Sequence, residues 1–268
     1  MGITYTLAVD IGASSGRHIL GSVQDGKIVL EEVYRFENGY TEKNGHFCWD
    51  FDRLFAEILN GMKRCGELGK TPVSMGIDIW GVDFVLLDEN GKVLGDTVAY
   101  RDSRTAGMDE EVARLISPEE LYARTGIQKQ SYNTIYQLMA VKKEHPDYLE
   151  KAQRLLMTPE YFHYLLTGKA VNEYTMATTT QLVNAKARTW DLELLEKLGY
   201  PARIFGELNL PGTKVGSLKP EIAKQVGYSC DVVLPGTHDT ASAVLAVPKT
   251  EENAMYISSG TWSLIGVE

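Results

Sequence analysis

The segment 8–17, Ala-Val-Asp-Ile-Gly-Ala-Ser-Ser-Gly-Arg, places an aspartate, two serines and two glycines between apolar runs. This pattern is typical of a strand, a tight turn and a second strand. Gly12 and Gly16 permit backbone angles that other residues resist, and they let an anion approach the backbone closely. The N–H groups and hydroxyls of the turn can bind a phosphate, to which Arg17 adds a charged fork. An ordinary hairpin with a solvated aspartate is the alternative.

Asp10 stands at the mouth of this turn and would repel a phosphate. A divalent cation between the two removes the conflict, and Mg²⁺ carried by a nucleotide is the cation expected. The sequence therefore suggests a nucleotide-phosphate site in which Asp10 faces the metal.

A second candidate site is the run Pro-Gly-Thr-His-Asp-Thr at residues 235–240. An apolar strand ends there in a glycine turn, and Asp239 stands at the entry to a helix. Open α/β sheets expose their active sites at the carboxyl ends of strands. A carboxylate in that place can accept the proton of a substrate hydroxyl as its oxygen attacks phosphorus. The alternative is that Asp239 only caps the helix, and His238 suits either a substrate contact or a structural role.

The strand at residues 76–84 breaks at Gly81, directly after Trp80. An indole gives an apolar wall and an N–H donor, and a glycine lets a small polar ligand touch the backbone, which is how sugars are often bound. For Asp78, Asp83 and Arg104, a structural ion pair or turn is at least as good an interpretation as substrate contact.

Ser-Ser-Gly occurs twice, at residues 14–16 and 258–260, each time between two expected strands. Two such hairpins that face each other across a cleft would hold the phosphates of a nucleotide from both sides.

The 268 residues carry a formal net charge of -9, which argues against nucleic acid or an anionic membrane surface as the main partner. The first residues lack a signal peptide, and no apolar stretch is long enough to cross a bilayer. Three cysteines, Cys48, Cys65 and Cys230, are far apart and unpatterned. They indicate reduced thiols in the cytoplasm.

The first 90 residues alternate as strands, a helix and strands, which predicts a mixed sheet with helices packed on it. The helix should begin at Asp50 or Asp52. The strands expected are 7–10, 17–23, 27–36, 73–79 and 84–87, with a polar loop at 37–45 and the helix at 51–65.

Residues 103–198 have mostly helical texture, with capping signals at Ser117 and Thr158. Further helices are expected at 191–198, 220–226 and 239–247, a strand at 231–234, and a last hairpin at 255–257 and 263–267. This hairpin has no visible sheet partner, and isolated hairpins are marginally stable. We therefore expect the chain to be the front part of a longer protein.

The order DIGASSGR, GIDIWGVDF, AYRDSRT, EYTMATTTQLVN, GTHDTASAV and YISSGTWSL resembles the FGGY family of carbohydrate kinases over essentially the whole chain. The resemblance implies an actin-like, ribonuclease-H-like α/β ATPase fold with two domains and a cleft between them. It implies a sugar-binding domain at residues 1–247 and the start of a nucleotide-binding domain at 248–268, most of the second domain being missing.

Site residues follow from the same resemblance, position by position. The ATP-phosphate loop corresponds to Ala13, Ser14, Ser15, Gly16 and Arg17, and the second phosphate hairpin to Thr261; Asp10 corresponds to the metal-side aspartate, and Gly81, His238, Asp239 and Thr240 to sugar contacts.

The implied activity is Mg²⁺-dependent transfer of the ATP γ-phosphoryl group to the 1-hydroxyl of L-rhamnulose, with Asp239 as general base. Another deoxyketose such as L-fuculose is an alternative substrate, because one methyl or hydroxyl group can decide it. A non-catalytic actin-like module that binds sugar or phosphate is a second alternative, although such a module needs no Asp239. We expect the chain alone to bind ketose and to transfer phosphate poorly.

Overall fold

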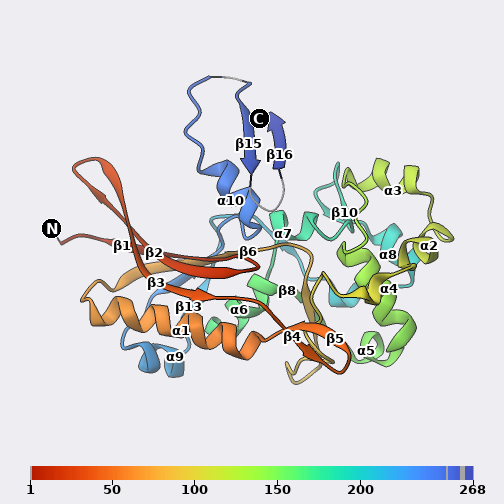
Figure 1. Cartoon of the computed structure of the whole chain (residues 1–268), viewed down its shortest axis with the longest axis horizontal. Helices are drawn as coiled ribbons and strands as arrows, with labels where there is room; N and C mark the ends of the chain where they lie inside the picture. Colours follow the sequence, from red (N-terminus) through yellow and green to blue (C-terminus); the bar gives the residue numbers. More distant parts are fainter. Residues whose placement is uncertain (1, 252, 260–262, 268) are drawn as a thin grey trace.

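A computed structural model of the chain describes residues 2–251, 253–259 and 263–267. Its centre is a six-stranded sheet with the strand order β13-β14-β6-β1-β2-β3 (Figure 1). The strands β1 (Tyr5–Ile11), β6 (Pro72–Ile79) and β14 (Asp231–Val233) run parallel. The strands β2 (Ser15–Gln24), β3 (Lys27–Glu37) and β13 (Lys214–Ser217) pair antiparallel. The sheet is therefore mixed, as the sequence predicts.

The first three strands form a meander because short turns join runs of apolar and β-branched residues. β2 spans Ser15–Gln24 and β3 spans Lys27–Glu37, so both are longer than expected. Along β1, the side chains of Leu7, Val9 and Ile11 are buried while Asp10 is half-buried on the opposite face. This alternation separates a core face from a face that carries polar groups.

Helices cover the core face of the sheet. α1 (Phe51–Glu67) and α9 (Pro220–Val226) lie beneath it in Figure 1, together with α6 (Thr158–Thr167). Asp50 caps α1, since its carboxylate accepts the Arg53 N–H at 2.9 Å. The opposite face meets the shorter helix α10 (Asp239–Leu245), above which the hairpin of β15 (Met255–Ser259) and β16 (Ser263–Val267) projects (Figure 1).

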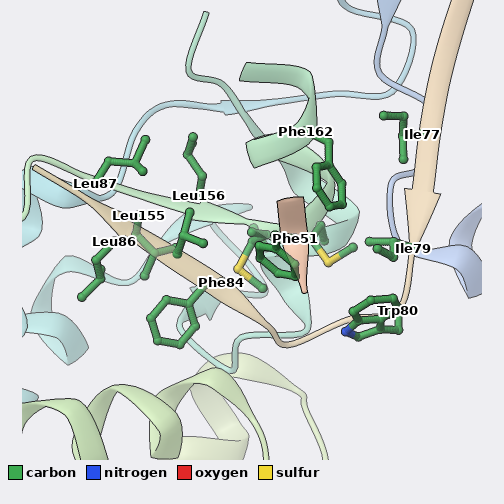
Figure 2. Close-up of a cluster of buried hydrophobic side chains, with 14 of the residues drawn as sticks. Phe51, Ile77, Ile79, Trp80, Phe84, Leu86, Leu87, Leu155, Leu156 and Phe162 are labelled. Carbon is green, nitrogen blue, oxygen red and sulfur yellow. The ribbon is translucent and has the colours of Figure 1, made fainter. Parts of the chain in front are cut away.

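The core continues from the sheet into a second group of elements. Figure 2 shows Ile77 and Ile79 of β6 directed toward Phe162 of α6, and Trp80 where β6 ends. Beyond Trp80, β7 (Phe84–Leu87) pairs with β8 (Arg154–Met157), and both strands are almost wholly buried.

Around this pair lie α4 (Thr134–Glu144), which is at the right of Figure 1, and smaller elements. They are η1 (Ser103–Thr105), α2 (Met108–Ala113), α3 (Pro118–Thr125), α5 (Pro146–Lys151), β9 (Asn172–Glu173), α7 (Tyr174–Thr178), β10 (Val183–Asn184), β11 (Thr189–Trp190), α8 (Leu192–Leu198), η2 (Ala202–Ile204) and β12 (Leu208–Asn209), and β13 (Lys214–Ser217) leads back into the sheet.

Two local predictions were wrong. The expected polar loop 37–45 contains β4 (Tyr40–Lys43), which pairs with β5 (His46–Trp49) because Asn44-Gly45 supplies two positive-φ residues for a tight turn. Thr158 does not cap α6: Met157 holds the cap position, and its N–H donates to Glu160 at 2.8 Å. The expected helix ends at Gly168, Gly199 and Gly227 are confirmed, since all three have left-handed φ.

No helix in the described ranges combines the length and the apolar character needed to cross a membrane.

Candidate functional site

Asp10 and Arg17 face each other across β1 and β2. The Arg17 guanidinium donates to the Asp10 carboxylate through Nε at 2.8 Å and through Nη2 at 2.7 Å. Both side chains are partly exposed, which makes the pair adaptable and of small energetic value. The structure thus directs Arg17 to Asp10, whereas the sequence suggested that it would face a phosphate directly.

The turn between β1 and β2 is closed by its own backbone. The Gly12 N–H donates to the Ser15 carbonyl at 2.8 Å, and the Asn38 side chain donates to the Gly12 carbonyl at 2.8 Å. Within the described residues, the N–H groups of Ala13 and Ser14 have no protein acceptor. A phosphate cradle at this turn would therefore use those two amides and the neighbouring hydroxyls.

The reason for the glycines differs from the expected one. Neither Gly12 nor Gly16 has a left-handed φ, so unusual backbone angles do not explain them. A Cβ at position 16 would instead lie 2.2 Å from the Phe36 ring. Gly16 is thus required by close packing beneath the turn.

Asp78 lies beside Asp10, because the two are paired residues of the parallel strands β6 and β1. Burial raises the pKa of the Asp78 carboxyl well above its usual range, and the charges of Asp10 and Asp239 raise it further. From the sequence, a structural ion pair or turn is at least as good an interpretation of Asp78 as contact with substrate. The signal that links it to the site is its place one residue before the end of a parallel strand, the same place that Asp10 has on β1.

The turn at 235–238 runs alongside the end of β6. The Ile79 N–H donates to the Thr237 carbonyl at 3.0 Å, and Ile79 forms an isolated parallel bridge with His238. This places Asp239 at the same sheet edge as Asp78 and Asp10. The predicted base and the predicted metal-side aspartate therefore lie on one face of one sheet.

Asp239 is the first residue of α10, and His238 holds the cap position without a side-chain capping bond. One carboxylate oxygen of Asp239 accepts from the Thr240 N–H at 2.6 Å and from the Thr240 hydroxyl at 3.2 Å. His238 Nε2 is 3.5 Å from the same oxygen, and the Asp239 side chain is 42% exposed. Asp239 therefore does not occupy the cap position. The two hydrogen bonds from Thr240 go to one oxygen of its exposed carboxylate, so the other oxygen can bind a ligand.

Gly81 lies in a tight turn that follows Trp80. A Cβ there would lie 2.9 Å from the methyl carbon of Thr179, and Val82 has a φ of +70°, which is rare for a β-branched residue. The strained turn is held from several sides, because Thr179 accepts the Val82 N–H at 3.0 Å and Thr134 donates to the Val82 carbonyl at 2.7 Å.

Behind this turn, Asp83 is buried and accepts four hydrogen bonds. The donors are the indoles of Trp49 at 2.6 Å and Trp80 at 2.9 Å, the Gln137 amide at 3.1 Å and the Tyr100 N–H at 3.2 Å. Burial raises the Asp83 pKa, while these hydrogen bonds and the Arg104 charge oppose the rise. The role of Asp83 is thus to fix Trp80, and Arg104 reaches it through Gln137, to which it donates at 2.6 Å.

A cavity of about 300 Å³ lies on the far side of Arg104, between β7, α4 and the segment 93–98. Its polar lining includes His46, Asp96, Glu144 and Tyr148. Arg104 lines it, but Gly81, His238, Asp239, Thr240 and the phosphate turn at 13–17 do not, so the cavity is separate from the candidate site.

Thr261, the predicted contact of the second phosphate hairpin, lies outside the described residues, as does Gly260 of the second Ser-Ser-Gly. The structure describes Ser258 and Ser259 at the end of β15.

The residues around the turn fit the expected magnesium ion only as one that a nucleotide carries. No group of three or more His, Cys, Asp or Glu residues with metal-site geometry occurs in the described residues. Mg²⁺ that arrives with a nucleotide needs one or two carboxylates, with phosphates and water completing its shell. Asp10, partly exposed and beside the turn with the free Ala13 and Ser14 amides, fits that requirement within the described residues.

Several solved structures of sugar kinases share this fold. A carbohydrate kinase from Novosphingobium aromaticivorans matches with a TM-score of 0.83 at 23% identity, over 100% of this chain and 56% of that chain. The xylulose kinase from Rhodospirillum rubrum matches with a TM-score of 0.79 at 19% identity, over 94% of this chain and 52% of that chain. The fold is therefore that of the actin-like ATPase domains of FGGY sugar kinases.

The chain belongs to the FGGY family of carbohydrate kinases, because the profile of that family's N-terminal domain matches residues 5–246. The rhamnulokinase of Halalkalibacterium halodurans is 59% identical over 266 residues, which are 99% of this chain and 56% of the relative. The rhamnulokinase of Bacillus subtilis is 44% identical over 265 residues, 98% of this chain and 54% of the relative. The chain spans about half the length of the curated relatives it matches.

Proposed function

We propose that this chain binds L-rhamnulose and that Asp239 acts as the general base when the ATP γ-phosphoryl group is transferred to the sugar's 1-hydroxyl. The observation that carries the proposal is that an accessible Asp239 carboxylate lies near Asp10 and Asp78, at the end of β6 that leads into the Gly81 turn. The identity to rhamnulokinases supports the choice of sugar.

In the reaction, Asp239 accepts the proton of the 1-hydroxyl as that oxygen bonds to the γ-phosphorus and the bond to ADP breaks. His238, beside the base, and Thr240, which donates to it, orient the carboxylate and contact the sugar. The Gly81 turn forms the opposite side of the sugar site, with the buried Trp80 indole packed against Trp49 behind it.

The phosphate end of the site is the turn of Ala13, Ser14, Ser15 and Gly16, with Arg17 beside it. Asp10 would hold the Mg²⁺ that ATP carries, and this ion, when bound, would neutralise phosphate charge. Both Arg17 contacts go to Oδ2 of Asp10, so they would have to open for that oxygen to reach the ion. Thr261 would add a contact from the second hairpin.

The domain division proposed is a sugar-binding unit at residues 1–247 and the beginning of a nucleotide-binding unit at 248–268. Most described apolar side chains of the β15–β16 hairpin are exposed, which supports its assignment to a separate unit. We also propose the cytoplasm as the compartment, supported by the free thiols of Cys48, Cys65 and Cys230.

Thermal unfolding with a panel of sugars tests the sugar assignment on the chain itself. A ligand at 100 times its Kd adds about 2.7 kcal/mol to stability, which raises the Tm by roughly 5–10 °C in a domain of this size. L-Rhamnulose should give this rise, and glycerol and xylulose should not. A rise with L-fuculose alone would replace the proposed sugar, and no rise with any sugar would contradict the proposal.

The base is tested with Asp239→Asn in the chain extended by the remaining part of the H. halodurans relative. Coupled ADP release should fall at least about 100-fold, because the amide cannot accept the proton. The Tm rise with L-rhamnulose should persist. Unchanged turnover would remove Asp239 from the reaction and favour a non-catalytic module.

A further inference from the structure

The short helix α7, residues 174–178, lies between the two turns that are proposed to contact the sugar. Glu173 stands at its beginning and Thr179 at its end. Each of these residues bonds to a different turn, Glu173 to the turn before Asp239 and Thr179 to the turn at Gly81. The helix therefore connects the base side and the Trp80 side of the site.

At the first end, the Glu173 carboxylate is completely buried and fully engaged. It accepts the N–H groups of Thr175 at 2.8 Å and Met176 at 3.0 Å, and the Thr175 hydroxyl at 2.6 Å. It also accepts the hydroxyl of Thr237 at 2.7 Å and the Thr237 N–H at 3.2 Å. A buried carboxylate shared by two segments holds them tightly, because an unpaired buried charge would be costly.

Thr237 links Glu173 to the backbone that carries the proposed base, Asp239. It is buried, it immediately precedes His238, and its carbonyl accepts the Ile79 N–H at 3.0 Å. The His238 N–H also approaches the Thr175 hydroxyl at 3.4 Å. Glu173 thus fixes the backbone from which Asp239 projects, on the side away from β6.

At the other end, the Thr179 hydroxyl donates to the Met176 carbonyl at 2.8 Å and accepts the Val82 N–H at 3.0 Å. Its methyl carbon lies where a Cβ of Gly81 would clash. Because Val82 has a left-handed φ, its turn keeps this shape only while neighbouring groups hold it. Thr179 is one of those groups, with one polar and one steric contact.

We propose that Glu173 and Thr179 are positioning residues that set the spacing between the Gly81 turn and Asp239, and thereby the fit of the ketose. The inference rests on the proposed function, since it assumes that both turns contact the sugar. Neither residue touches the sugar itself; both act through the turns that they hold. Thr134 and Gln137 also hold Val82, so the turn survives in the fold when Thr179 is altered, but its position is less well defined.

The experiment is titration calorimetry of L-rhamnulose into the whole chain, with Tm measured for every variant. Thr179→Val removes the hydroxyl at nearly constant volume and should weaken sugar binding at least about tenfold, because the turn loses the hydrogen bond from the Val82 N–H and α7 loses the bond to the Met176 carbonyl. Thr179→Ser restores the hydroxyl and should recover most of the affinity. Thr178→Val is the matched control, since its hydroxyl bonds only to the Thr175 carbonyl within α7.

Thr237→Val and Thr237→Ser test the other end in the same way, and they avoid the folding defect that loss of the buried Glu173 would cause. Valine should weaken binding and serine should recover it. Wild-type affinity in Thr179→Val and Thr237→Val would overturn the inference, as would an equal loss in Thr178→Val. Absence of sugar binding by the wild type would instead overturn the proposed function, and the inference with it.

Discussion

Asp10 and Asp78 are direct partners in the parallel pairing of β1 and β6, so two carboxylates project side by side from one face of the sheet. On the other side of β1, the partner of Asp10 is Arg17 of β2. A row of charged side chains thus crosses three adjacent strands next to Asp239. The Arg17 bond goes to Asp10, so no ion pair among the described residues offsets the burial of Asp78 in this row.

Asp78→Asn should therefore stabilise the chain at neutral pH. The folded-state pKa of Asp78 is raised by burial and by two neighbouring acids, so its carboxyl is harder to ionise in the folded than in the unfolded chain. A raised acid pKa reduces stability as pH rises above the unfolded value of 3.8. We expect a Tm gain of about 2–4 °C at pH 7, equivalent to about 1 kcal/mol, measured by thermal unfolding.

The gain should shrink as the pH approaches 4, where the carboxyl of the unfolded chain also becomes protonated. Asp25→Asn is the control, because Asp25 lies in the exposed turn between β2 and β3 and asparagine suits its φ of +50°. A Tm for Asp78→Asn at or below the wild-type value at pH 7 would contradict the electrostatic account.

Asp83→Asn should destabilise the chain although it removes a buried charge. An asparagine amide presents two N–H groups where the Trp49, Trp80 and Gln137 donors converge, so at least one buried donor loses its acceptor. We expect a loss of about 2–4 kcal/mol in the free energy of unfolding, measured with urea.

Asp52→Asn in the exposed first turn of α1 is the comparison, and should cost no more than about 0.5 kcal/mol through the helix dipole. If Asp83→Asn matched that value, the four hydrogen bonds to Asp83 would have little net importance.

The sheet and most helices could be predicted because their signals are local. Apolar runs between glycine turns identified β1, β2, β3 and β6, and the glycines at 168, 199 and 227 ended helices as expected. Shorter elements such as β4, β9 and α7 lack a periodic pattern of sufficient length. Their formation depends on tertiary partners, as the parallel pairing of β9 with β12 shows.

The candidate site could be predicted only residue by residue. Asp10, Asp239 and Gly81 stand in motifs, but the hydrogen bonds of Glu173 join residues 64 positions apart and leave no local signature. The same limit applies to Gly16, whose requirement arises from Phe36 on a neighbouring strand. Sequence motifs identify the residues that could contact substrate or nucleotide. Only the packing identifies the residues that position them.

Gly16→Ala should destabilise the chain by about 1–3 kcal/mol, the usual effect of overpacking, because its Cβ would enter the Phe36 ring. Urea unfolding measures this loss. Phe36→Leu in the same chain should make the alanine less harmful, since a smaller side chain leaves room for the Cβ. Gly39→Ala is the control, because a Cβ at Gly39 would meet open space. Additive losses in Gly16→Ala/Phe36→Leu would mean that the two residues do not interact.

His163 on α6 should make the chain sensitive to acid. It is completely buried, and neither ring nitrogen has a partner among the described residues, so burial lowers its pKa to about 3. The unfolded chain takes up this proton near pH 6.5 and the folded chain does not, so stability present above pH 6.5 is lost as pH falls toward 3. Between pH 7 and pH 5 the loss should be about 2 kcal/mol.

His163→Leu removes this contribution and fills the site with an apolar side chain, so about 2 kcal/mol of the loss between pH 7 and pH 5 should disappear. Part of the acid sensitivity should persist, because burial also lowers the pKa of His18 to about 4. His145→Leu, at an exposed position, should keep the full wild-type slope. Urea unfolding at the two pH values measures each slope. An unchanged slope in His163→Leu would mean that a group other than His163 takes up the proton, and that the buried imidazole is hydrated or shielded.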